Sequence, residues 1–326
     1  MSDPYPAFID KYQPKIRDAI LKVWEELRKS VSYKELETAL VTRGVNGMME
    51  YLDDLEPITR ALLMPELQQA MDESGRLVVE ILPTGSITIP GYTPSVQFTN
   101  PYTVQAVQEY SFNLIRDLSN ETREAVRLAV TTAVSQGRPP AAIARDYKQT
   151  IGLTVKQEQS VQNYRRYLET LDRQALQRQS RDKRSDRTVE RAIRDEKPLP
   201  KATIDKLVAA FRRNREAERS LTIARTESMS AMDLGQDLAL EQSRGDGALA
   251  PDLIQYWNVA RDGRQRDEHD VVPSMNPDGV PYGEFFQTPL GPMRYPRDRK
   301  YGTAKNVIRC RCRRSFKRRG VTQGYT

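Results

Sequence analysis

The residues with the most chemical potential in this chain are also its rarest. Its 326 residues include one histidine, His269, and two cysteines, Cys310 and Cys312. Imidazole and thiolate groups are good zinc ligands, and a nearby carboxylate can supply a fourth. The acidic residues closest to the histidine in sequence are Asp262, Asp267, Glu268 and Asp270. The sequence therefore predicts a candidate zinc site formed by His269, Cys310, Cys312 and Asp262.

The two cysteines also fit other roles. On a strand, a Cys-x-Cys spacing points both thiols to the same face, whereas structural zinc sites more often space their cysteines further apart. Two small buried thiols in a core strand are therefore an alternative, while a disulfide between Cys310 and Cys312 would be strained. A reactive thiol or metal at His269, Cys310 and Cys312 would instead indicate a hydrolase or nuclease.

Basic residues around the cysteines form a second candidate site. Residues 291–326 carry 12 basic side chains against one acidic one. If "NVIRCRCRRSFKR" is a strand, the arginines that alternate with the cysteines point away from them and form a basic ladder. Such a ladder can bind nucleic-acid phosphates or an acidic protein surface. The residues predicted for this role are Arg309, Arg311, Arg313, Arg314, Lys317, Arg318 and Arg319.

Composition excludes some classes of protein and leaves others open. The net charge of +7 covers opposite local balances, since residues 221–290 hold 5 basic and 12 acidic side chains and residues 171–220 hold 15 basic and 9 acidic ones. No apolar run approaches the ~20 residues of a membrane-spanning helix, and the N-terminus lacks a signal-peptide core. P-loop, dinucleotide-binding and HExxH motifs are missing from the sequence. We therefore expect a protein of the reducing cytoplasm with no membrane association.

Periodicity and turn signals predict an α+β protein that is mainly helical, with long arms and a small C-terminal α+β domain. "LIQYWNVA" and "NVIRCRCRRSFKR" are the expected strands. Residues 171–200 are dense in charge and poor in aromatic side chains, which favours a solvated arm or insertion. The expected regions are a helical one at 1–82, an extended Pro/Gly-rich connector at 83–100, a helical one at 101–170, the charged arm at 171–200, the C-terminal domain at 201–318 and a tail at 319–326.

The helix predicted across "SLTIARTESMSAMDLGQDLAL" has an unusual face. Its members are spaced three and four residues apart and most are small, so another element must approach closely. They are Leu221, Ala224, Ser228, Ala231, Gly235 and Leu238. Glu227 lies at the edge of this face, and a buried carboxylate needs a partner. We expect Arg225 or Glu227 to contact the segment 261–269.

Four segments together resemble the C-terminal domain of the Mu F-like phage head morphogenesis proteins. They are "IARTES" at 223–228, "YWNVARDGRQRDEH" at 256–269, "PDGVPYGEFF" at 277–286 and "IRCRC" at 308–312. The resemblance covers about residues 200–315 and assigns a shared structural motif to Arg225, Glu227, Trp257, Asp262, Arg266 and His269. Residues 171–200 then look like an insertion, and Arg309 stands where the family commonly has Asn.

This resemblance implies a minor head protein that enters the procapsid in few copies and associates with the portal. It implies a role in head assembly or DNA delivery and no established catalytic activity, so we expect a protein that is not an enzyme. The expected location is the capsid interior near the portal, after assembly in the host cytoplasm. The expected partners are the portal protein, packaged double-stranded DNA, and the scaffold or major capsid protein.

Overall fold

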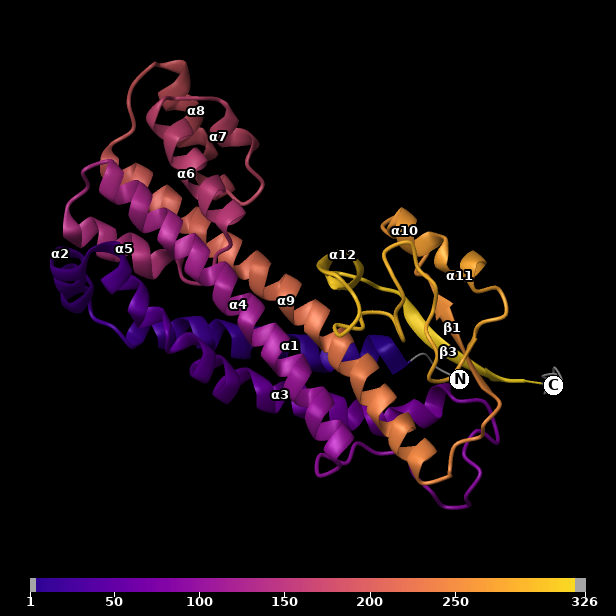
Figure 1. Ribbon diagram of the computed structural model, residues 1–326. Helices are drawn as coiled ribbons and strands as arrows, with labels where there is room; N and C mark the ends of the chain where they lie inside the picture. Colours follow the sequence, from indigo (N-terminus) through magenta and orange to yellow (C-terminus); the bar gives the residue numbers. More distant parts are fainter. Residues whose placement is uncertain (1–3, 320–326) are drawn as a thin grey trace. The chain divides into compact units, whose positions relative to one another are not determined.

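The computed structural model describes residues 4–319, so most of the expected tail, residues 320–326, lies outside the described residues. The chain is mostly helical with a small three-stranded antiparallel sheet, which confirms the α+β class (Figure 1). It divides into two compact units. Unit 1 comprises Met1–Ala19, Leu62–Asn113 and Thr222–Thr326, and unit 2 comprises Ile20–Ala61 and Leu114–Leu221. The units are thus discontinuous in sequence, unlike the consecutive regions that were expected.

Four long helices contribute residues to both units. They are α1 (Pro4–Lys29), α3 (Leu55–Leu77), α4 (Pro101–Ser135) and α9 (Lys201–Gly245). The shorter helices of unit 2 are α2 (Tyr33–Met49), α5 (Pro140–Thr150), α6 (Val155–Glu169), α7 (Gln174–Gln177) and α8 (Asp186–Arg194), with 3₁₀ turns at Glu50–Leu52 and Lys183–Ser185. In unit 1, α3 is followed by a further 3₁₀ turn at Val78–Ile81. Among the described residues, no helix is both long and apolar enough to cross a membrane.

Local sequence signals set several of these helix boundaries. Ser32 caps α2 through a reciprocal capping box with Glu35, and Thr154 does the same for α6. Helix α5 begins at Pro140, directly after Pro139, and is followed by Gly152 at φ +92°. Asn120 is a residue type that often caps helices, but here it lies inside α4, which is continuous from Pro101 to Ser135.

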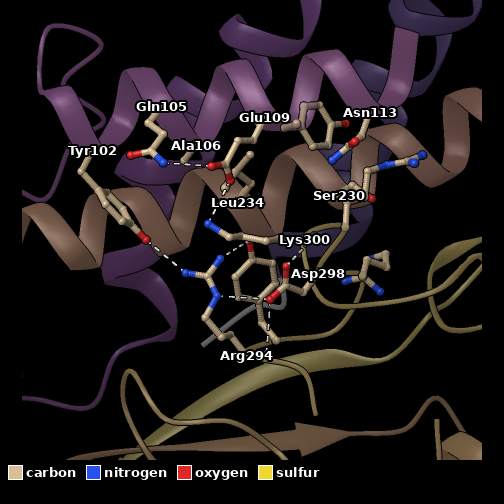
Figure 2. Close-up of a pocket in the computed structure, with 14 residues that line it drawn as sticks. Tyr102, Gln105, Ala106, Glu109, Asn113, Ser230, Leu234, Arg294, Asp298 and Lys300 are labelled. Atoms are coloured by element: carbon tan, nitrogen blue, oxygen red, sulfur yellow. Dashed lines mark hydrogen bonds and ion pairs between the residues drawn. The ribbon is translucent and has the colours of Figure 1, made fainter. Parts of the chain in front are cut away.

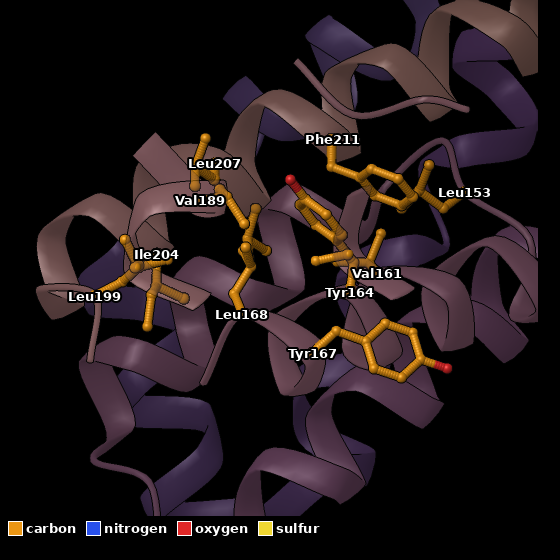
Figure 3. Close-up of a cluster of buried hydrophobic side chains, with 13 residues drawn as sticks. Leu153, Val161, Tyr164, Tyr167, Leu168, Val189, Leu199, Ile204, Leu207 and Phe211 are labelled. Carbon is orange, nitrogen blue, oxygen red and sulfur yellow. The ribbon is translucent and has the colours of Figure 1, made fainter. Parts of the chain in front are cut away.

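The expected solvated arm at 171–200 is instead part of a packed helical cluster in unit 2 (Figure 3). Ala175 of α7, Val189 and Ala192 of α8, and Leu199 are all buried in it. They pack with side chains of α6 and of the first part of α9. Tyr164 of α6 stacks on Phe211 of α9, with ring centroids 4.5 Å apart. The expectation was wrong because a helix of nine residues needs only a few correctly spaced apolar side chains to be held in place.

In unit 1, the small-residue face of α9 packs as the sequence predicted, except that Leu221 is exposed. A Cβ atom at Gly235 would lie 2.2 Å from the carbonyl oxygen of Met71 in α3, so glycine is required there. The hydroxyl of Ser74 in α3 donates to the carbonyl of Met232, which ties the same two helices together. The connector 83–100 contains no helix, and Ile87 forms an isolated antiparallel β-bridge with Leu249, which follows α9 in the chain.

The sheet of unit 1 has the order β2-β1-β3, with both pairs antiparallel. Its strands are β1 (Leu253–Asn258), β2 (Val280–Pro281) and β3 (Arg313–Arg318), and Trp257 pairs with Arg314 across β1 and β3. Three short helices accompany it: α10 (Asp267–Asp270), α11 (Val272–Met275) and α12 (Ala304–Val307). The strand expected to include both cysteines starts only at Arg313, because α12 and a turn with Arg309 at φ +56° precede it.

Candidate metal centre

His269, Cys310 and Cys312 come together in unit 1, as the sequence predicted. His269 lies on α10, and the two cysteines lie between α12 and β3. The Nδ1 atom of His269 is 3.5 Å from the Sγ of Cys310 and 3.4 Å from the Sγ of Cys312. The three side chains are buried, and one ligand atom from each lies within 4.8 Å of the others. They form a group that could hold a metal ion.

The distances in this group suit zinc. With zinc bonds of about 2.3 Å to sulfur and 2.0–2.1 Å to nitrogen, tetrahedral geometry places nitrogen and sulfur about 3.6 Å apart. The two nitrogen–sulfur distances of 3.5 and 3.4 Å are close to that value. The donor set of two sulfurs and one imidazole is also one that zinc accepts. The centre is therefore compatible with zinc.

Apolar side chains enclose one side of the centre. Trp257 of β1 packs edge-on against His269, with ring centroids 5.7 Å apart, and against Phe286 at 5.6 Å. Val272 and Met293 complete the same buried cluster. The expectation that Trp257 packs beside the histidine and the cysteines is confirmed.

Asp262 is not the fourth ligand that the sequence predicted. Both oxygens of its carboxylate accept hydrogen bonds from the guanidinium of Arg311, and the carboxylate is partly exposed. Among the described residues, the group of His, Cys and acidic side chains able to hold a metal contains only His269, Cys310 and Cys312. Sequence proximity suggested Asp262, but the nearby arginine binds it instead.

The arginine that matters most for the centre was not predicted from the sequence. Arg297 is 1% exposed, and its guanidinium donates to the carbonyls of Cys310 and Cys312. The same nitrogen lies 3.7 Å from the Sγ of Cys310. The second terminal nitrogen of the guanidinium, Nη2, forms a fully buried ion pair with Asp233 of α9. Arg297 therefore fixes the segment with the cysteines to the longest helix of the chain.

The two thiols differ in acidity. The pKa of Cys310 is well below its usual range because its sulfur accepts a hydrogen bond from the Cys312 thiol, with further lowering by His269 and Arg297. The same hydrogen bond, together with burial, raises the pKa of Cys312. Cys310 is therefore the first of the two to become the thiolate that metal ligation requires.

More buried ion pairs surround Arg297. Arg314 of β3 is 2% exposed and pairs with Asp237 of α9 at 2.9 Å, and Arg294 pairs with Asp298 at 3.2 Å. Figure 2 shows Arg294 between Tyr102 and Asp298, in the lining of a small cavity of about 80 Å³. Asp233 and Asp237 are four residues apart and so lie on the same face of α9. This spacing could have predicted that cationic side chains pack against that face.

Glu227 is buried, as expected, but its partner is different from the one expected. It accepts a hydrogen bond from Tyr110 Oη at 2.6 Å and forms an ion pair with Arg299. Arg225, two residues earlier, is exposed. The expected contact with 261–269 was wrong, because the helix turns Glu227 towards α4 and the 294–300 loop. Arg266 binds elsewhere and donates to the carbonyl of Ile308.

Replacing Glu227 by Ala should lower the free energy of unfolding by about 1–3 kcal/mol, because Tyr110 and Arg299 lose a buried acceptor. Urea denaturation followed by circular dichroism measures the change. Arg225→Ala, an exposed change on the same helix, is the matched control and should leave the midpoint unchanged. Equal midpoints for the two variants would contradict the anchoring role of Glu227.

The predicted basic ladder is not present in the form expected. Arg314 points into the core, Arg311 pairs with Asp262, and Arg318 pairs with Asp252. Arg309 donates to Thr222, Arg313 lies over the ring of Tyr5, Lys317 lies over the ring of Tyr256, and Arg319 is exposed. The ladder fails because residues 309–312 are not a strand, so alternation does not apply to them.

Comparisons of the chain with protein-family models, with curated proteins and with solved structures find no match. The functional interpretation therefore depends on the residues of this chain and on how they are arranged.

Proposed function

We propose that this chain is a phage minor head protein that acts in head morphogenesis, associates with the portal inside the capsid and influences DNA packaging or ejection. The main support is that segments far apart in the sequence, which carry the Mu F-like pattern, contribute to the interior of one unit. Trp257 and His269 lie beside Cys310 and Cys312, and Glu227 of α9 is buried in the same unit, where it pairs with Arg299. Such use of rare residues suits a domain that has to be stable rather than reactive.

Burial favours this proposal over the alternative of a thiol- or metal-dependent hydrolase or nuclease. His269, Cys310 and Cys312 are only 3–4% exposed, and the backbone around the two cysteines is fixed by Arg297. A thiol nucleophile must reach its substrate, and burial keeps the sulfurs of Cys310 and Cys312 from doing so. Among the described residues, no carboxylate lines the space beside the three side chains, so a metal-bound water there would lack a general base. We therefore propose that the protein is not an enzyme.

We also propose that the centre binds zinc, held by Nδ1 of His269 and the sulfurs of Cys310 and Cys312. Zinc would join α10 to the segment that leads into β3, and so crosslink a domain whose sheet has only three strands. The structural role is supported by the Arg297 hydrogen bonds to the same segment, since such contacts orient metal ligands.

The proposed partners are the portal protein first, and packaged DNA and the scaffold or major capsid protein next. Co-expression with the portal protein of the same phage tests the assignment directly. We expect the two proteins to co-purify and the chain to be found in assembled heads at low copy number. Absence of the chain from purified heads, together with metal-dependent cleavage of duplex DNA that Cys310→Ser abolishes, would replace this proposal by the nuclease alternative.

A further inference from the structure

A cavity of about 220 Å³ lies against the three candidate metal ligands. His269, Cys310 and Cys312 all contribute to its lining, on the side not covered by Trp257. The rest of the lining consists of Ala260, Gln265 and four arginines. A metal ion held by the three ligands would therefore face this cavity.

The cavity carries an excess of positive charge. Of its four arginines, Arg311 is neutralised by Asp262, whereas Arg264, Arg266 and Arg309 form no salt bridge with the described residues. A zinc ion with two thiolates and one neutral imidazole has no net charge, so it does not offset these cations. Their positive potential favours an anion in the cavity over water or a neutral ligand.

Two of these arginines are already held in position. Arg266 donates to the carbonyl of Ile308, and Arg309 donates to Thr222, while its backbone N–H donates to the hydroxyl of Thr226. Neutral acceptors fix the guanidinium groups without removing their charge. Arg264 has only a backbone hydrogen bond, to Asp262. The cavity thus has two anchored cations and one adjustable cation.

Two polar atoms of the lining residues lack a hydrogen-bond partner among the described residues, Oε1 of Gln265 and Nε2 of His269. The Oε1 of Gln265 is buried and accepts no hydrogen bond from the described residues. A buried acceptor without a donor costs free energy, so a ligand or water that donates to it is favoured. A singly protonated phosphate can donate one hydrogen bond there while its other oxygens face the arginines and the metal.

We propose that this cavity is a phosphate-binding site, in which a phosphate oxygen completes the tetrahedral coordination of zinc. The inference depends on the proposed zinc centre. Zinc sites with three protein ligands keep their fourth position for an exchangeable ligand. Here that position faces Gln265 and three uncompensated arginines, which selects an oxyanion. The ligand recognised by this site is a phosphate group, which could come from inorganic phosphate or from the terminal phosphate of a nucleic acid.

Cobalt substitution tests the site without any assay of activity. Purified protein is stripped of metal and loaded with Co²⁺, whose thiolate charge-transfer absorption reports the cysteine ligands and whose visible bands report the fourth ligand. Addition of inorganic phosphate should change the visible bands in a saturable way while the charge-transfer absorption persists. A 5′-phosphorylated oligonucleotide and its unphosphorylated form then show whether a terminal phosphate binds in the same way.

Arg264→Gln should weaken phosphate binding about tenfold, as expected for one lost charge-assisted hydrogen bond. Arg264 is exposed and forms no side-chain contact that folding requires, so this variant should fold normally. Arg261→Gln is the matched control, because Arg261 is also exposed but does not line the cavity. It should bind phosphate as the unmodified protein does.

The outcomes separate the two proposals. If Co²⁺ produces no thiolate charge-transfer absorption, the proposed zinc centre is wrong, and the proposed phosphate site, which depends on it, is wrong as well. If Co²⁺ binds through the cysteines but phosphate leaves the visible bands unchanged, the fourth position is closed and only the phosphate site is overturned. Equal phosphate affinity in the Arg264 and Arg261 variants would also overturn it.

Discussion

Replacing Arg297 by Met is expected to lower the free energy of unfolding by about 3–5 kcal/mol at pH 8.5, because the buried carboxyl of Asp233 loses its ion-pair partner and must either stay charged without one or take up a proton. Both side chains of this pair are 0% exposed. The change also removes the donor to the carbonyls of Cys310 and Cys312. Urea denaturation followed by tryptophan fluorescence and circular dichroism measures the loss.

A second substitution separates the lost charge pair from other effects of the change. Asp233→Leu in the Arg297→Met background removes the unpaired carboxylate and should restore most of the stability, as apolar replacements of buried ion pairs often do. Arg194→Met is the surface control, since Arg194 pairs only with the exposed Asp195 next to it. No measurable change is expected there. A double variant as unstable as Arg297→Met alone would show that the carboxylate is not the cause.

The effect of Arg297→Met should grow with pH. Burial raises the pKa of Asp233 to about 7, against about 3.9 in an unfolded chain. The stability that this shift contributes is therefore full below about pH 4 and is lost as the pH rises to about 7. Without Arg297 the folded pKa is higher still, so the loss continues above pH 7 at about 1.4 kcal/mol per pH unit. A deficit no larger at pH 8.5 than at pH 6 would contradict this account.

These ion pairs explain the charge asymmetry of the sequence. The acidic stretch 221–290 and the basic end 291–326 contain the two halves of the same buried network in unit 1. Glu227, Asp233 and Asp237 on α9 meet Arg299, Arg297 and Arg314. The sequence suggested that the basic end binds nucleic-acid phosphates or an acidic protein surface, because a sequence does not show which charges face one another. Much of its charge is neutralised internally instead.

The sequence was most informative where local rules apply. The small face of α9 and strand β1 depend on neighbouring residues, and they were predicted correctly apart from the exposed Leu221. The rarity of His269, Cys310 and Cys312 was also enough to predict that they meet. The role of Arg297 depends on contacts with Asp233 and the Cys310 carbonyl, 64 and 13 residues away in the chain. No periodic pattern marks such a residue, and the positive φ of 63° at Arg297 is set by the fold around it.

The same limit explains the errors over strand β3 and the arm at 171–200. "IRCRCRRSFKR" alternates in sequence, but the first part follows a turn whose backbone is bound by Thr226 and Arg297. Tertiary hydrogen bonds therefore decide where the strand starts. For 171–200, overall polarity suggested solvent, although the few apolar side chains of α8 were correctly spaced for packing. Average composition conceals such spacing.

Removing the metal from the protein is expected to destabilise it by about 4 kcal/mol if zinc was present at about a thousand times its dissociation constant. The reason is that zinc binds the folded centre and the unfolded chain lacks a preformed site. The experiment compares urea denaturation with excess zinc and with a chelator, both under reducing conditions. Metal analysis should find one zinc per chain in the purified protein.

The variants needed for this test follow from the competing interpretation of Cys310 and Cys312 as small buried thiols. Cys310→Ala with Cys312→Ala removes two metal ligands but keeps the positions small and uncharged, so it should bind no zinc and respond to neither zinc nor chelator. His269→Gln should lose most of the zinc while both thiols remain. If the thiols served only for packing, the unmodified protein would also have the same midpoint with zinc and with chelator. That result would leave the contacts of Arg297 and Trp257 as the sole support of this part of unit 1.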